Sequence, residues 1–99
     1  MIVIVATMKA KEGQEMELEE ILKGMIANVQ PEEGVRMYTL HRAKDDPGKF
    51  LFYEMYKDKV ALDFHGSQPY FKDFGRNISG LVVERPKIDV YEDIISIKR

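Results

Sequence analysis

The stretch Phe50-Leu51-Phe52-Tyr53-Glu54-Met55-Tyr56-Lys57-Asp58 is rich in aromatic and aliphatic side chains, which is typical of a strand. Alternate residues of a strand share a face. One face would therefore carry Phe50, Phe52, Glu54 and Tyr56, and the other Leu51, Tyr53 and Met55. A carboxylate among aromatic rings must reach water, find a partner or hold a proton, because burying an unpaired charge is costly. The candidate partner for Glu54 is His65.

Before this stretch, Val35 to Ala43 alternates in character and is predicted to be a strand. Asp45-Asp46-Pro47-Gly48 is a strong turn sequence, so the two strands should form a hairpin. Ile2 to Lys9, rich in Val and Ile, is predicted to be another strand. Between the strands at residues 2–9 and 35–43, apolar residues from Leu18 to Val29 recur at spacings of three and four, which predicts an amphipathic helix. The helix should stop at Pro31 and be followed by a turn at Glu32-Glu33-Gly34.

After the stretch, Asp58 can cap a short helix that runs through His65 and is interrupted at Gly66. Ser67-Gln68-Pro69 can start a second helix, since proline is tolerated in the first helical turn. The apolar stripe of this helix would consist of Tyr70, Phe71, Phe74, Ile78, Leu81 and Val82. Pro86 separates it from a fourth predicted strand, Ile88 to Ile97.

The predicted order is β-α-β-β-α-β, which is typical of the ferredoxin-like α+β fold: a four-stranded antiparallel sheet with helices on one face. At 99 residues the chain is expected to form a single domain, residues 1–99. Several strands carry apolar residues on both faces. The open face of the sheet is therefore expected to be covered by the same face of a second copy, giving a homodimer.

Composition narrows the classes of function. The net charge is −2, from 15 basic and 17 acidic residues, and no basic run suggests a nucleic-acid partner. The absence of cysteine excludes disulfides and thiolate chemistry. The apolar N-terminal run is too short for a secretion signal or a membrane span, so a cytoplasmic location without membrane association is expected.

Four short motifs, in order and at fixed spacing, resemble a known family. They are Lys-x-Gly-x-Glu at Lys11 to Glu15, Glu33-Gly34 before a strand with Tyr38, Phe52-Tyr53-Glu54-x-Tyr56, and His65-x-Ser67-x-Pro69-Tyr70-Phe71. Over nearly all of its length the chain resembles the antibiotic biosynthesis monooxygenase superfamily of dimeric α/β barrels.

This resemblance implies several activities. Members include quinol monooxygenases and polyketide-tailoring oxygenases that use no metal or flavin, and an isomerase that degrades a phosphorylated autoinducer, to which the Tyr-Glu-x-Tyr-Lys-Asp and Phe-His segments are also similar. Haem-degrading members use a Trp with a His and an Asn, and this chain contains no Trp.

The candidate catalytic residues are His65 and Glu54. His65 could exchange a proton near neutral pH, and Glu54 could fix its tautomer as the orienting carboxylate. The alternative for His65 is a packing or capping role at a helix end. The candidate substrate-binding residues are Phe52, Tyr56, Tyr70, Phe71, Phe74, Tyr38 and Arg36. For the aromatic residues among them the alternative is core packing. The cations to test against a phosphorylated ligand are Arg36, Lys72 and Arg76.

A protein-built metal site is not expected, because the only histidines, His41 and His65, have no ligand-like spacing, and His41 is expected to face solvent. The sequence contains no Gly-rich nucleotide fingerprint, so no cofactor is expected either. The first hypothesis is a cofactor-independent monooxygenase that takes a small quinol-type aromatic and dioxygen. An isomerase of a small phosphorylated carbonyl compound and a non-catalytic dimeric ligand-binding protein remain the alternatives.

Overall fold

The computed structural model describes all residues, 1–99, and contains a single four-stranded sheet with three helices. In chain order the elements are β1 (Ile2–Lys9), α1 (Glu15–Val29), β2 (Val35–Ala43), β3 (Asp46–Tyr56), α2 (Lys59–Ser67), α3 (Pro69–Ile78) and β4 (Lys87–Glu92).

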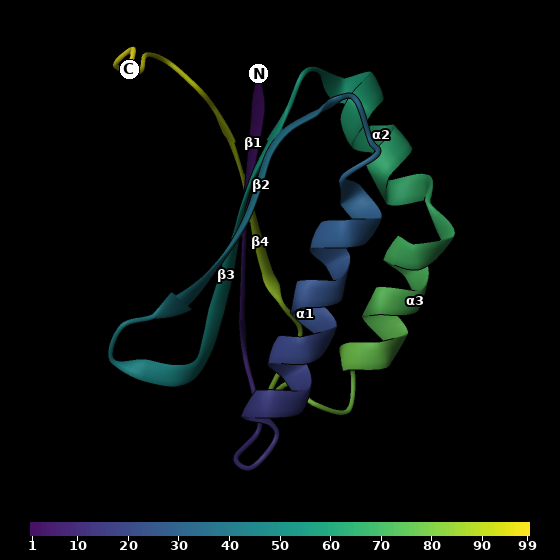
Figure 1. Cartoon of the computed structure of the whole chain (residues 1–99), viewed down its shortest axis with the longest axis vertical. Helices are drawn as coiled ribbons and strands as arrows, with labels where there is room; N and C mark the ends of the chain where they lie inside the picture. The colour runs from purple at the N-terminus through teal and green to yellow at the C-terminus, as the bar shows by residue number, and fades with distance from the viewer.

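The strands lie in the order β2-β3-β1-β4, and every neighbouring pair is antiparallel. All three helices lie on one side of the sheet, which Figure 1 shows edge-on. This arrangement confirms the predicted ferredoxin-like α+β fold. It also makes β3 a central strand, with Ile4 of β1 and Tyr38 of β2 paired on either side of Glu54.

The core lies between the sheet and the helices. The even-numbered residues of β3 from Gly48 to Tyr56 are buried, with Phe50 and Phe52 only 1% exposed, so the predicted division of its two faces is confirmed. The apolar stripe of α1 covers these rings, and its Leu18 and Leu22 have no exposed surface. Full burial of one leucine side chain contributes about 1.5–3 kcal/mol, so this face of α1 holds the helix in place.

The predicted fourth strand is wrong at both ends, because β4 spans Lys87–Glu92 rather than Ile88 to Ile97. The partner strand explains the early end. Glu92 pairs with Ile2, the first residue of β1, and the N-terminal ammonium donates to the Asp93 carboxylate at 2.8 Å. Beyond that point β1 offers no further backbone to pair with.

Two other boundaries differ from the prediction. The hairpin turn lies at residues 44–45, so that Asp46, Pro47 and Gly48 already belong to β3. Helix α3 ends at Ile78, although the predicted apolar stripe runs on to Val82. Val82 instead forms an isolated bridge with Ala10, just after β1.

The sheet face away from the helices is uncovered in the single chain. The C-terminal tail and the tip of the β2–β3 hairpin both extend beyond the sheet on this side (Figure 1). The tail carries Ile94, Ile95 and Ile97, which are 94%, 89% and 76% exposed. None of the helices has the length and apolar character needed to cross a membrane.

Candidate functional site

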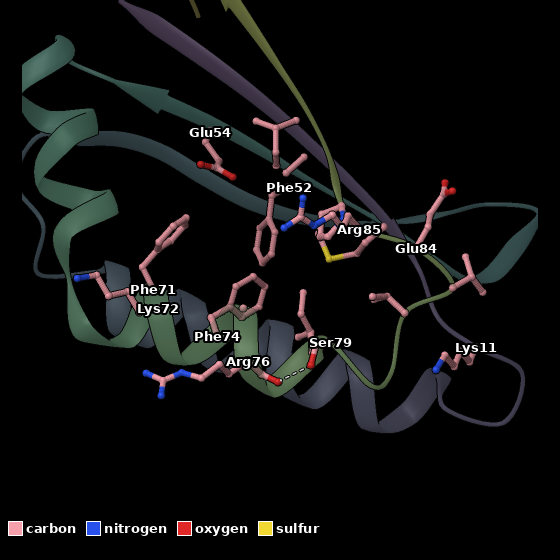
Figure 2. Close-up of a pocket in the computed structure, with 18 of the residues that line it drawn as sticks. Lys11, Phe52, Glu54, Phe71, Lys72, Phe74, Arg76, Ser79, Glu84 and Arg85 are labelled. Atoms are coloured by element: carbon pink, nitrogen blue, oxygen red, sulfur yellow. Dashed lines mark hydrogen bonds between the residues drawn. The ribbon is translucent and has the colours of Figure 1, made fainter.

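A cavity of about 890 Å³ lies between the sheet and α3. Its floor comes from β1, β2 and β3 and its opposite wall from α3, while the segment 79–86 that leads to β4 closes one side. Most of its lining is apolar, and Figure 2 shows Phe52, Phe71 and Phe74 around it with the Glu54 carboxyl. Such a space fits a small aromatic molecule.

Glu54 is the acidic group that the sheet itself presents to this cavity. Its side chain is only 6% exposed, and the Tyr56 hydroxyl, from the same face of β3, donates to its Oε1 at 2.5 Å. Burial raises the pKa of Glu54 to about 7; the Tyr56 hydrogen bond opposes this rise and the nearby Glu32 carboxylate adds to it. Glu54 can therefore both accept and release a proton near neutral pH.

His65 is buried beside the cavity, and its partner is Glu32. Nδ1 of the imidazole lies 2.9 Å from Oε2 of Glu32, and the Tyr70 hydroxyl donates to the same oxygen. The predicted Glu54–His65 pair is not formed, because the Glu54 carboxyl is held by Tyr56 while the turn after α1 brings Glu32 under α2.

The ring of His65 packs among aromatic side chains. Its centroid lies 5.6 Å from that of Tyr38, 5.4 Å from Tyr56 and 5.0 Å from Phe71, the last in an edge-to-face arrangement. Two buried atoms of the pair, Nε2 of His65 and Oε1 of Glu32, have no hydrogen-bond partner. Buried polar atoms without a partner are rare in folded proteins and are found at functional sites.

The residues predicted to bind substrate fall into two groups. Phe52, Phe71, Phe74 and Tyr38 line the cavity together with Glu54.

Three further predicted residues do not line it. Tyr56 has no exposed surface, and its hydroxyl is engaged by Glu54; the Tyr70 hydroxyl is engaged by Glu32. Arg36 is exposed and lies in a separate polar depression with Glu33 and Lys57, because its position on β2 carries it away from the cavity.

The phenol groups around the site stay protonated at neutral pH. Burial raises the pKa of Tyr38 and Tyr56, and the negative charge of Glu54 raises both further. The pKa of Tyr70 is raised by burial and by its hydrogen bond to Glu32. These hydroxyls can donate hydrogen bonds, but they do not act as bases.

Sequence reasoning missed Glu32, which lies in the segment Glu32-Glu33-Gly34 and is indistinguishable there from an ordinary polar turn residue. It also missed Arg85, which lines the cavity from outside the recognised motifs, and it gave no cavity role to Lys11, the first residue of the Lys-x-Gly-x-Glu motif. No group of three or more His, Cys, Asp or Glu side chains is arranged to hold a metal ion.

Comparison with known proteins shows which family the chain resembles. The model of the antibiotic biosynthesis monooxygenase (ABM) family matches residues 1–77. A Synechocystis protein, sll1783, is 26% identical over 92% of this chain, which spans 62% of that protein's length. A Mycobacterium tuberculosis protein named "Putative monooxygenase Rv0793" is 26% identical, over 86% of this chain and 82% of that one. A solved structure from Deinococcus radiodurans, 23% identical, covers 100% of this chain and 98% of its own with a TM-score of 0.90, which supports the fold.

Proposed function

The chain belongs to the antibiotic biosynthesis monooxygenase family, and we propose that it is a cofactor-independent monooxygenase of a small quinol-type aromatic. The observation that carries this proposal is Glu54: a buried carboxyl, with its pKa raised to about 7, at the wall of an otherwise largely apolar cavity. A base poised near the working pH is what removal of a phenolic proton requires.

The reaction needs a base, an orienting cavity and dioxygen. Deprotonation makes the quinol electron-rich enough to donate electrons directly to dioxygen. A C–O bond then forms at the ring and the O–O bond breaks, so that quinol and dioxygen give a hydroxyquinone and water. In this scheme Glu54 takes the proton, Phe52 and Phe74 hold the ring, and the Tyr38 hydroxyl donates to a substrate oxygen.

His65 and Glu32 form a buried hydrogen-bonded pair beside the proposed site. Glu32 fixes the ring through Nδ1, and the buried Nε2 of His65 has no hydrogen-bond partner. Phe71 and Tyr38 line the cavity and pack against the His65 ring, whereas His65 itself does not line it, so we assign the first proton transfer to Glu54.

The test is oxygen uptake by the purified protein with a panel of quinols, each corrected for its spontaneous oxidation. We expect Glu54→Gln to lower turnover by roughly 10²–10⁴-fold, the usual contribution of a positioned base. Its amide oxygen can still accept from Tyr56, so the fold should be kept. His65→Ala is the comparison: if that variant, and not Glu54→Gln, abolishes the pH-dependent part of the rate, the base is His65. Oxygen uptake that never exceeds the spontaneous rate would reject the proposal.

A second candidate is isomerisation of a small phosphorylated carbonyl compound. Lys11 and Arg85 are among the residues that line the cavity, and cations there favour an anionic ligand. The same Glu54 would then move a proton between carbons next to a carbonyl. Isomer formation without oxygen uptake distinguishes this reaction from oxygenation, and ligand binding without either would indicate a non-catalytic binding protein.

A further inference from the structure

The charged side chains that line the cavity do not all point into it. Figure 2 shows the Lys72 ammonium and the Arg76 guanidinium turned away from the cavity, on the outer side of α3. The guanidinium of Arg85 is turned toward the cavity, which Glu54 enters from the sheet. A ligand in this space would meet a carboxyl from β3 and a cation from the segment before β4.

Arg85 is free to bind a ligand. Arg76 is paired with Asp73 at 2.9 Å, whereas Arg85 forms neither an ion pair nor a side-chain hydrogen bond within the chain. The cavity that Arg85 and Glu54 share is mainly apolar, with Met8, Phe52 and Val82 in its lining. Arg85 is exposed to solvent, and the apolar surfaces beside its guanidinium strengthen its attraction for an anion relative to a guanidinium surrounded by water alone.

The segment that carries Arg85 is held in place by its backbone. The Lys11 amide donates to the Leu81 carbonyl at 2.8 Å, and the Val83 amide donates to the Lys9 carbonyl at 2.9 Å. Pro86 follows directly, and a residue before proline is restricted to extended conformations. Arg85 therefore starts from a fixed backbone position, which reduces the conformational entropy lost on binding.

We propose that Arg85 is a specificity residue that binds an anionic substituent, a carboxylate or a phosphate, on the substrate. This inference rests on the proposed function, in that the substrate becomes a hydroxylated aromatic acid whose ring lies among Phe52 and Phe74, with its hydroxyl toward Glu54 and its acid group on Arg85. The planar guanidinium can hold either oxyanion through two parallel hydrogen bonds. Arg85 follows the residues that the family model matches, 1–77.

The test is calorimetric binding of three probes that share one ring system: naphthol, hydroxynaphthoate and naphthyl phosphate. The wild-type protein should bind at least one of the two anions more tightly than naphthol. Arg85→Gln should weaken binding of that anion by roughly 10- to 100-fold, as expected for the loss of a charged hydrogen bond, and leave naphthol binding within about twofold. Arg76→Gln is the matched control, because Arg76 is paired with Asp73 and turned outward, and it should change neither.

Equal affinity for naphthol and both anions, or an equal effect of the Arg85 and Arg76 substitutions, would overturn the inference. Whichever anion is preferred, selective loss in Arg85→Gln supports it: preference for hydroxynaphthoate points to an aromatic acid, and preference for naphthyl phosphate to a phosphorylated substrate. Because binding is measured without turnover, the result stands apart from the oxygen-uptake test. If the protein oxidises no quinol, it can still select anions through Arg85. If it does oxidise quinols, Arg85 can still prove to have no role in selecting anions.

Discussion

Two opposing influences on Glu54 decide when it can act as a base. Burial favours the neutral acid, while the hydrogen bond from Tyr56 favours the carboxylate. Burial is the larger effect, so the pKa rises to about 7 instead of falling. Tyr56 thus acts on the cavity through Glu54, since its own side chain has no exposed surface.

We expect Tyr56→Phe to move the pH profile upward. Without the hydroxyl, the Glu54 carboxylate loses its donor, so its pKa should rise further and the limb of kcat/KM that increases with pH should lie above that of the wild type. Tyr70→Phe is the control, because its hydroxyl bonds Glu32 instead. A limb that stays in place or moves to lower pH in Tyr56→Phe contradicts this account of Glu54.

The same carboxyl should make stability depend on pH. Its folded pKa of about 7 lies above the ordinary value of 4.5, so the folded state holds the proton more tightly than the unfolded state. Stability from this group is complete below pH 4.5 and is lost as pH rises toward about 7. The loss should be of order 3 kcal/mol. Urea unfolding of wild type and Glu54→Gln on both sides of this window checks it: the variant should lack this part of the pH dependence, and an equal dependence in both would contradict it.

The sequence could predict which face of its strand Glu54 occupies, because the alternation of faces depends only on neighbouring residues of the strand. It could not predict the partner of His65. Glu32 and His65 are 33 residues apart, and they meet only because the turn after α1 passes beneath α2. Nothing in the local sequence of Glu32 marks it as buried.

The position of α2 depends on a close contact with Gly34, which precedes β2. A Cβ added at Gly34 would lie 2.4 Å from Cβ and 3.3 Å from Cα of Ala61 in α2. The Gly34 carbonyl also accepts from the Lys57 amide at 2.8 Å, so this backbone cannot easily move aside. Only glycine allows α2 to approach closely enough to bring His65 to Glu32.

We therefore expect Gly34→Ala to lower the free energy of unfolding by about 1–3 kcal/mol, the usual cost of overpacking. Adding Ala61→Gly should relieve the clash, so the double variant should be less destabilised than the sum of the two single variants. Urea unfolding of the four proteins gives the interaction energy. Additive effects would show that the two residues do not limit the approach of α2.

Most elements could be predicted from their periodicity, but several of their ends could not. The end of β4 is set by the first residue of β1, which is a property of the pairing and not of the β4 sequence. Ile94, Ile95 and Ile97 look like strand residues, and their own sequence gives no sign that the partner strand has ended.

At the scale of the whole molecule, we propose that the open sheet face joins two copies of the chain. This face presents Leu51, Tyr53 and Met55 of β3. The exposed Met37 of β2 and Tyr91 of β4 lie on it at the two edges of the sheet. Light scattering at micromolar concentration should give the mass of a dimer. Tyr53→Glu should dissociate the dimer and lower stability, because it places a charge in the shared core. Phe64→Glu, on α2 and 55% exposed, should do neither. A wild-type monomer would reject this proposal.

The proposed site takes its base and its specificity residue from two different parts of the chain. Glu54 belongs to a central strand paired with β1 and β2, whereas Arg85 belongs to a short connection tied to the end of β1 by backbone bonds. Side-chain changes in residues 83–86 leave those bonds intact. An engineer seeking new substrates could therefore randomise this connection and keep the proton chemistry unchanged.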